Sequence, residues 1–382
     1  MKTSSSRRDF VKKSIALSLV APLLGSSLMS YTVEKKPLRI LILGGTSFLG
    51  PHQIAYALAR GHKVTIFTRG KSKPTVHLNL FDKVEQLVGD RENDLSALEK
   101  GSWDVVIDNS GRKTEWTRKT ADLLKDRAGM YMYTSSTGVY YPYLSELVDE
   151  NDKVLLVEPE NIQNEETKLE YWYGVMKATS EVETIKAFGE QRAIIVRPTY
   201  MMGPGDKSDR FIYWPVRLAR GGEILIPGKA NDPVQYIDVR DVAEWMIRLA
   251  EENKAGTYNA AGPKKPQGMK DFAIEAKASF DIDSNLVFVD DYDFLKKNRL
   301  PYLVPWILPE GDNYGSARIN NSKAIRAGLS LRKLQDSIRE MHAWWISSAL
   351  TQERRDKFEL KTGSLLLREA SILENWKSLK GE

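Results

Sequence analysis

Short apolar runs alternate with helix-length amphipathic segments through the first two thirds of the chain. Residues 38–43 (LRILIL), 63–67 (KVTIF) and 103–107 (WDVVI) are three such runs. Short apolar runs separated by segments that can cross over as helices are typical of buried parallel strands. The pattern predicts an α/β fold, a Rossmann-type doubly wound parallel sheet with a smaller C-terminal α+β region.

The first thirty residues follow a different pattern. Five basic residues precede an uncharged stretch, residues 14–30, and residues 6–12 (SRRDFVK) resemble the twin-arginine motif. A charged start followed by an apolar segment is typical of an export signal. The stretch is short for a membrane span, so we expect the twin-arginine machinery to export the protein, cleavage near Ser30 and a periplasmic mature chain. The alternatives are an uncleaved inner-membrane anchor and a frayed cytoplasmic terminus.

Removing this leader changes the charge balance. The chain has a formal charge of +5, but residues 31–382 hold 51 basic and 50 acidic residues, a formal charge of +1. A nucleic-acid partner therefore gains little support from charge. The absence of cysteine excludes thiol nucleophiles and iron–sulfur ligation, and the four histidines show no ligand spacing, so we expect no metal site.

A glycine-rich turn follows the first apolar run. Residues 44–50 (GGTSFLG) lead into a helix-like segment, residues 53–60. Glycines at such a turn let backbone N–H groups and the helix N-terminus approach a pyrophosphate closely. A purely structural turn is the alternative. The residues expected to hold the pyrophosphate are Gly44, Ser47, Phe48, Leu49 and Gly50.

Polar residues stand where three further apolar runs end. Arg69 follows the second run, where Arg can accommodate a 2′-phosphate, so the sequence favours NADP while NAD stays open. Asp90 ends another short run, residues 87–90 (LVGD), and is expected to reach the adenine, and Asn109 follows the run 103–107. The carboxyl ends of parallel strands meet at one edge of the sheet, where ligands bind.

Tyr173 and Lys177 are the candidate proton-transfer residues. At i and i+4 their side chains share one helix face. A neighbouring ammonium favours the phenolate, which can move a proton on a substrate oxygen while a nicotinamide moves the hydride. The spacing alone is common, and a solvated Lys beside a half-buried Tyr is the alternative.

Further sequence motifs follow the glycine-rich turn in a fixed order. Residues 130–140 (MYMYTSSTGVY) carry paired serines before Val-Tyr, and the ordered landmarks that follow are residues 197–205 (RPTYMMGPG), 235–243 (QYIDVRDVA) and 257–259 (TYN). From about Leu38 to Gly262 the sequence resembles the extended branch of the short-chain dehydrogenase/reductase superfamily, the NAD-dependent epimerase/dehydratase group.

The resemblance implies a role for each motif. Counting back from Val139-Tyr140 puts the catalytic hydroxyl, which bonds the substrate oxygen, on Ser136, while Tyr173 is the general acid/base and Lys177 supports it and holds the nicotinamide ribose. Hydride transfer at a carbinol carbon, transient or net, of a sugar-like or other hydroxylated substrate is the implied reaction. Further expected cofactor contacts are Pro198 and Thr199, and expected substrate contacts are Tyr140, Arg210 and Tyr236.

One departure from the group pattern opens a second interpretation. Ser47 stands where the usual turn has Gly, and the resulting Gly-Gly-Thr-x-Phe-Leu-Gly form resembles an atypical subgroup that includes the chloroplast stem-loop-binding proteins. A nucleotide- or RNA-binding module with little catalysis is therefore the alternative. The intact Ser136, Tyr173 and Lys177 and the near-neutral charge favour the enzyme.

Export and cofactor chemistry together predict a closed cycle. Twin-arginine substrates cross the membrane folded, so a dinucleotide bound in the cytoplasm could travel with the protein. Since no substantial free pool is expected outside, we hypothesise a retained cofactor, bound with about nanomolar affinity or better, and a redox-neutral reaction. The sequence leaves the substrate, the net reaction and the oligomeric state open.

Residues beyond the motifs are expected to form the substrate side. The predicted parts are a leader, a dinucleotide-binding domain to which a later segment returns, and a mainly substrate-binding and helical remainder: residues 1–30, 37–200 with 234–262, and 201–382. Residues 209–214 either offer a cation and aromatic faces to a ligand or pack their aromatics inward. Residues 300–309 form an irregular apolar segment, either a lid or a buried loop. Residues 331–348 and 365–380 predict helices.

Overall fold

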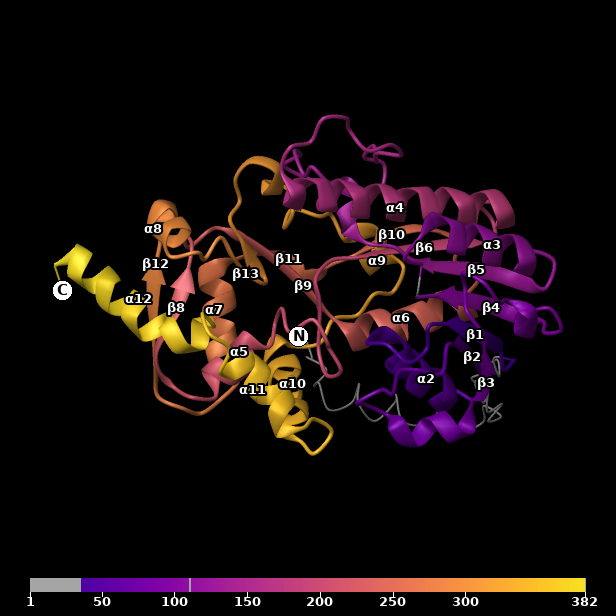
Figure 1. The fold of residues 1–382 in the computed structure, drawn as a ribbon, viewed down its shortest axis with the longest axis horizontal. Coiled ribbons are helices and arrows are strands. Elements are labelled where there is room, and N and C mark those ends of the chain that lie inside the picture. The colour runs from indigo at the N-terminus through magenta and orange to yellow at the C-terminus, as the bar shows by residue number, and fades with distance from the viewer. Residues whose placement is uncertain (1–35, 110, 382) are drawn as a thin grey trace, which may run out of the picture. The chain divides into compact units, whose positions relative to one another are not determined.

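Seven parallel strands form the central sheet of the computed structural model, which describes residues 36–109 and 111–381 (Figure 1). Along the sheet their order is β10, β6, β5, β4, β1, β2, β3. The strands are β1 (Arg39–Leu43), β2 (Lys63–Thr68), β3 (Glu85–Val88), β4 (Trp103–Asp108), β5 (Ala128–Thr134), β6 (Ala193–Pro198) and β10 (Gly256–Ala260). Ile40 of β1 lies between Val64 of β2 and Val105 of β4. From β1 the chain adds strands β2 and β3 on one side and then β4, β5 and β6 on the other, so the direction of strand addition reverses at β1. Ligands bind at such a switch point, outside the carboxyl ends of the strands.

Helices cover both faces of this sheet. The elements α2 (Leu49–Ala59) and α6 (Val239–Glu251) lie on one face, and α3 (Thr114–Leu124) and α4 (Glu165–Phe188) on the other (Figure 1). Ile40 and Ile42 of β1 pack into the core under α2 and α6, while Leu41 and Leu43 pack into the core under α3 and α4. Burial on both faces is why Ile40, Leu41, Ile42 and Leu43 of β1 are apolar at successive positions. The predicted doubly wound fold is confirmed.

Helix α4 carries Tyr173 and Lys177 and approaches the loop after β5 closely. Asn164 caps its start by accepting a hydrogen bond from the Thr167 N–H at 2.9 Å, and the helix stops at Gly189, whose φ is 72°. A Cβ added to Gly174 would lie 2.6 Å from the carbonyl oxygen of Gly138. Glycine at this position therefore lets the helix backbone touch the loop.

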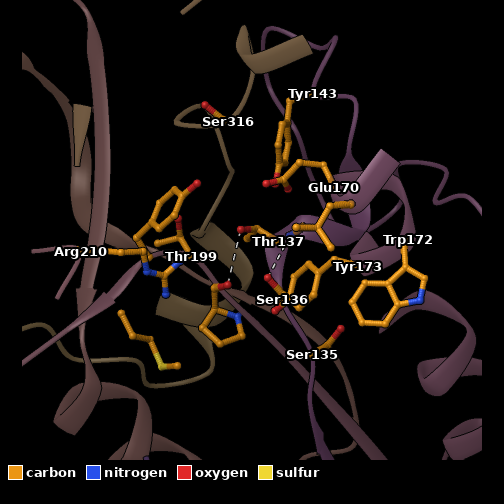
Figure 2. Close-up of a pocket in the computed structure, with 15 residues that line it drawn as sticks. Ser135, Ser136, Thr137, Tyr143, Glu170, Trp172, Tyr173, Thr199, Arg210 and Ser316 are labelled. Atoms are coloured by element: carbon orange, nitrogen blue, oxygen red, sulfur yellow. Dashed lines mark hydrogen bonds between the residues drawn. The ribbon is translucent and has the colours of Figure 1, made fainter. Parts of the chain in front are cut away.

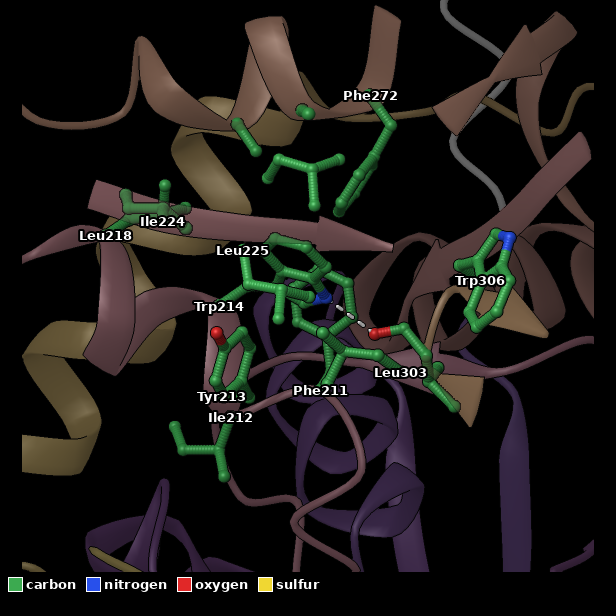
Figure 3. Close-up of a cluster of buried hydrophobic side chains, with 14 of the residues drawn as sticks. Phe211, Ile212, Tyr213, Trp214, Leu218, Ile224, Leu225, Phe272, Leu303 and Trp306 are labelled. Atoms are coloured by element: carbon green, nitrogen blue, oxygen red, sulfur yellow. Dashed lines mark hydrogen bonds between the residues drawn. The ribbon is translucent and has the colours of Figure 1, made fainter. Parts of the chain in front are cut away.

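A second core lies in the C-terminal region (Figure 3). Its strands are β7 (Met201–Met202), β8 (Gly222–Pro227), β9 (Pro233–Asp238), β11 (Gly262–Gly268), β12 (Ser284–Val289), β13 (Tyr302–Leu303) and β14 (Trp306–Ile307). Its helices are α5 (Tyr213–Leu218), α7 (Met269–Lys277), α8 (Tyr292–Lys297), α10 (Leu334–Ile346), α11 (Gln352–Glu359) and α12 (Leu365–Lys380). The buried Trp214 donates from Nε1 to the Val304 carbonyl at 2.7 Å and meets Phe272 edge-on.

The shorter elements connect these layers. They are the 3₁₀ helices η1 (Leu78–Lys83), η2 (Ser96–Leu98), η3 (Thr137–Tyr140) and η4 (Gly311–Asn313), and α9 (Ser322–Arg326). Within the described ranges no helix is long and apolar enough to cross a membrane. The expected leader lies outside the described residues.

The structure decides between two pairs of sequence alternatives. Phe211, Tyr213 and Trp214 are buried in the second core, so the aromatic residues of 209–214 pack inward. The segment 300–309 is a short hairpin of β13 and β14 in which Trp306 is fully buried and donates to Asp232 at 2.8 Å. Its apolar residues therefore belong to a core rather than to a lid. Helices were expected over 331–348 and 365–380, and α10 and α12 lie there.

We expect Gly174→Ala to destabilise the protein by about 1–3 kcal/mol, the usual cost of overpacking. Helix propensity alone would stabilise the variant by about 1 kcal/mol. Urea unfolding measures the free energy, with Val182→Ala, an exposed change in the same helix, as the control. A Gly174→Ala protein as stable as the parent would show that the close approach is not a constraint.

Candidate active site

A cavity of about 450 Å³ lies where β5, β6 and the start of α4 meet (Figure 2). Residues from six separate stretches of the chain line it. The lining residues are Ser135, Ser136, Thr137, Gly138, Tyr143, Leu169, Glu170, Trp172, Tyr173, Pro198, Thr199, Tyr200, Met201, Arg210 and Ser316. We call this cavity the main pocket. It lies at the carboxyl edge of the sheet, where the fold places ligands.

Ser136 and Tyr173 lie next to each other on the wall of the main pocket. Ser136 caps η3 by accepting a hydrogen bond from the Gly138 N–H at 3.0 Å. A Cβ on Gly138 would lie 2.9 Å from the Tyr173 ring, so the ring packs over this glycine. The neighbouring Ser135 donates its hydroxyl to Glu181. Ser136 is thus the serine whose hydroxyl hydrogen remains available to a ligand.

Lys177 is buried behind Tyr173. Its Nζ donates to the Thr134 carbonyl at 3.0 Å and lies 5.0 Å from the centre of the Tyr133 ring. Burial alone would lower the pKa of Lys177, but the phenols of Tyr133 and Tyr173 and the carboxylate of Asp108 outweigh it and raise that pKa. The ammonium therefore stays charged under the site.

A buried ion pair joins α4 to β6. Arg197 donates from Nε and Nη2 to the two carboxylate oxygens of Glu181 at 2.9 and 2.6 Å. Its Nη1 donates to the Tyr140 hydroxyl at 2.6 Å. The Tyr140 hydroxyl in turn donates to Asn259 of β10 at 2.8 Å. Burial raises the pKa of Tyr140 to about 12. Tyr140, expected to contact substrate, points into this network and not into the main pocket.

The glycine-rich turn has the shape expected of a pyrophosphate site. A Cβ on Gly50 would lie 2.4 Å from the Gly45 carbonyl oxygen, and Gly44 has a φ of 84°, so the turn requires both glycines. From the described residues, no side chain caps the N-terminus of α2. Its first N–H groups, which an α-helix leaves without intrahelical partners, therefore fit an anionic group of a dinucleotide.

Two loops lie against this turn. Phe48 packs beside Val76 and Gly205, and a small space among them is also lined by Pro74 and Lys207. His52 of α2 joins both loops, since its ring contacts the Pro204 carbonyl at 2.9 Å and the His77 ring at 3.2 Å. A carbonyl only accepts, so Nε2 of His52 carries the proton and Nδ1 accepts from His77.

Three expected cofactor residues lie at strand ends with different surroundings. Arg69 is exposed directly after β2. Asp90 accepts from the Glu92 N–H at 2.8 Å and so closes a local turn. Asn109 is held from both sides, donating to Gln53 at 2.6 Å and accepting from Thr134 at 2.8 Å.

The remaining expected residues divide between two cavities. Pro198, Thr199 and Arg210 line the main pocket. Tyr236 donates to Gln267 at 3.0 Å and lines a separate cavity of about 210 Å³. The structure therefore does not bring Tyr236 to Tyr173.

Several pocket residues were not expected from the sequence. Glu170 lies one turn before Tyr173, and the i, i+3 spacing on the predicted helix is the signal that would have found it. Partial burial and the neighbouring Glu166 raise its pKa, against Arg210, which lowers it. Tyr143, Tyr200 and Ser316 come from loops whose sequences carry no such signal.

Comparison with known proteins assigns the chain to a family. Residues 40–261 match the NAD dependent epimerase/dehydratase family. The chain belongs to this family. The recognition of the family from its motifs is confirmed.

Solved structures of this fold include enzymes with a bound dinucleotide. The Bordetella bronchiseptica enzyme WbmH in complex with NAD+ is 14% identical, with a TM-score of 0.57 over 82% of this chain and 99% of that one. The Bacillus cereus UDP-glucuronic acid 4-epimerase in complex with NAD is 17% identical, with a TM-score of 0.54 over 80% and 98%. At such identities the likeness shows the fold.

A curated relative points to a different activity. The "Chloroplast stem-loop binding protein of 41 kDa b" of Arabidopsis thaliana is 28% identical over 294 residues, 73% of this chain and 72% of the relative. Family membership and fold are therefore shown, while the activity of this family member is not.

We expect His52→Gln to flatten the acid dependence of stability. Burial lowers the pKa of His52 from 6.5 to about 4, so the unfolded chain binds a proton between these values that the folded chain does not. The group therefore costs stability as the pH falls from about 6.5 to about 4, in total about 3 kcal/mol. Denaturant unfolding at several pH values measures this slope, and an unchanged slope in the variant would assign it to other groups.

Proposed function

We propose that this protein is an NAD(P)-dependent oxidoreductase of the epimerase/dehydratase type that acts at a carbinol carbon of a hydroxylated substrate. The observation that carries the proposal is that Ser136 and Tyr173 lie side by side on one wall of the main pocket, with the charged Lys177 buried behind them. The glycine-rich turn lies at the same edge of the sheet. A pocket with an acid/base group beside a dinucleotide turn matches hydride chemistry.

The roles of the chain's own residues follow from their positions. Ser136 donates its hydroxyl hydrogen to the substrate oxygen, and Tyr173 as phenolate takes the hydroxyl proton while the adjacent C–H bond breaks. The nicotinamide, when bound, accepts that hydrogen as hydride. Lys177 keeps a positive charge buried behind Tyr173. The reverse steps return the hydride and the proton.

We further propose that the dinucleotide is retained through this cycle. The loops that carry Val76 and Gly205 meet at Phe48 of the turn and are joined through His52, so a molecule seated on the turn would be enclosed by them. Retention suits the proposed export to the periplasm by the twin-arginine route, where free nucleotide is not expected. A redox-neutral reaction, in which the same hydride is taken and returned, needs no exchange of cofactor.

A binding function without redox chemistry is the second candidate. It is favoured by the name of the curated relative, a chloroplast stem-loop binding protein. The near-neutral charge of residues 31–382 argues against it, because RNA affinity depends on basic groups that neutralise phosphates. Salt-sensitive retention of a stem-loop RNA by the purified protein, together with no change of nicotinamide absorbance, would favour this candidate.

We expect Tyr173→Phe to lower the rate of hydride transfer by about 10²–10⁴-fold, the usual contribution of a general acid or base. Tyr171→Phe is the matched control, because Tyr171 lies two residues away and packs edge-on against Tyr141 outside the main pocket. Stopped-flow absorbance of the nicotinamide measures the rate with an active substrate. Equal losses in the two variants would refute the assignment of Tyr173.

We expect the mature protein, purified from periplasm without added nucleotide, to contain close to one dinucleotide per chain and to turn over without further supply. Mass spectrometry after denaturation counts the bound molecule and distinguishes NADP, which Arg69 favours, from NAD. An empty protein that works only with stoichiometric external cofactor would refute retention while leaving the proton chemistry of Tyr173 untouched.

A further inference from the structure

The charges of the main pocket are few and of opposite sign. Glu170 and Arg210 are the charged residues among its lining side chains. In the described part of the chain neither forms an ion pair, and Arg210 stacks over Tyr200 at 5.2 Å while its Nε donates to Ser208 at 3.2 Å. Both side chains are exposed to the pocket opening. They are close enough for Arg210 to lower the pKa of Glu170. The lining side chains thus bring one positive and one negative charge, with the Lys177 ammonium buried behind Tyr173.

A nucleoside diphosphate does not suit this arrangement. Its pyrophosphate brings two negative charges, which proteins usually bind with guanidinium or ammonium groups. The pocket supplies one guanidinium, and the carboxylate of Glu170 opposes the same phosphates. The energetic balance therefore favours a ligand without phosphate.

The remaining pocket wall suits an uncharged ring with hydroxyl groups. Tyr143, Tyr200 and Trp172 offer aromatic faces that accept the C–H side of a ring, and the two tyrosines also bring phenol hydroxyls. Burial and the charge of Glu170 raise the pKa values of both phenols, so each stays a hydrogen-bond donor. The carboxylate of Glu170 supplies the matching acceptor.

Thr199 is a polar residue of the pocket wall with a buried hydroxyl. Its side chain is 7% exposed, it lines the main pocket, and its Oγ1 has no hydrogen-bond partner within residues 36–109 and 111–381. Buried hydroxyls without a partner are rare in folded proteins. Thr199 is also an expected contact of the dinucleotide, so a polar group of either the cofactor or the substrate would complete this hydrogen bond.

We propose that the main pocket binds a neutral, unphosphorylated sugar ring, such as the terminal residue of a glycoside, with Glu170 accepting hydrogen bonds from its hydroxyls and balancing Arg210. This inference rests on the proposed function, because it names the substrate class of the same site. It separates the protein from enzymes that take nucleotide-linked sugars.

Calorimetry on the protein as purified, with any retained dinucleotide in place, tests the proposal. The probes are methyl glycosides of glucose, galactose and mannose, the corresponding UDP-sugars, and methyl glucuronide. We expect at least one methyl glycoside to bind with a Kd of about 1 mM, typical of a ligand of this size, and no UDP-sugar to bind more tightly than its methyl glycoside. A UDP-sugar that binds tenfold tighter, or a full panel of glycosides that fails to bind, overturns the proposal.

A matched pair of variants tests the role assigned to Glu170. Glu170→Gln should weaken the methyl glycoside about tenfold, the loss typical of a hydrogen bond to a charged group, and should raise the affinity for methyl glucuronide relative to methyl glucoside, because Arg210 is no longer balanced. Glu166→Gln removes an exposed carboxylate one turn earlier on α4 and outside the pocket lining, and should change each affinity less than twofold. Equal effects of the two variants would remove Glu170 from the site.

The nicotinamide absorbance of the same samples keeps the two proposals apart. Reduction of the bound cofactor by a UDP-sugar alone would support the oxidoreductase and refute the neutral-sugar pocket. Binding of a methyl glycoside with its Glu170 dependence but without any hydride transfer, on any member of the panel, would support the pocket and count against the oxidoreductase.

Discussion

The close approach of α4 to the loop after β5 is the constraint on which the candidate site depends. Two glycines make it possible, because a Cβ at Gly174 would meet the Gly138 carbonyl oxygen and a Cβ at Gly138 would meet the Tyr173 ring. The Glu181–Arg197 pair then ties the same helix to β6. Removing one partner of a buried pair leaves an unpaired charge and is strongly destabilising. Backbone contact and ion pair together hold Tyr173, Ser136 and Lys177 in one geometry.

The ion pair also explains why the serine motif contains two serines with different surroundings. Ser135 satisfies Glu181 inside the protein, and this bond fixes the backbone that presents Ser136 to the pocket. Tyr140, three residues beyond Thr137, accepts a hydrogen bond from Nη1 of Arg197, the guanidinium nitrogen that Glu181 does not bind. The motif therefore combines a serine that faces the main pocket with the buried polar contacts that position it. Such fully paired networks rigidify the element that carries them.

The sequence was sufficient to predict the fold and those site residues that lie within one turn of the same helix. Unbroken apolar runs predict the parallel strands because both faces of the sheet are covered, and Tyr173 and Lys177 share a helix face at i and i+4. Tyr140 and Tyr236 show where this reasoning ends. Their hydroxyls are taken by Asn259 and Gln267, and only the tertiary structure brings these partners together.

The residues that line the pocket opposite Tyr173 could not be read from the sequence for a related reason. Tyr143 and Ser316 lie far apart in the chain, and the Tyr143 carbonyl accepts from the Gly315 N–H at 2.7 Å, which places both loops at the pocket. A contact of such long sequence separation leaves no periodic signal. Glu170 is different, because its spacing from Tyr173 is local and the helix was predicted.

The glycine-rich turn and the main pocket are bounded by different residues, which is relevant to the proposed cycle with a retained cofactor. The turn that would hold a dinucleotide is covered by contacts of Phe48 with Val76 and Gly205 and by the His52 bridge. The main pocket is bounded instead by Tyr143, Glu170 and Ser316, and no residue is shared between the two sets. Leu169 and Trp172, at its rim, are 60% and 43% exposed. The opening of the main pocket is therefore formed by residues other than those that contact Phe48 and His52. A protein that returns its hydride to each substrate requires this independence, because exchange at one end must leave the other end closed.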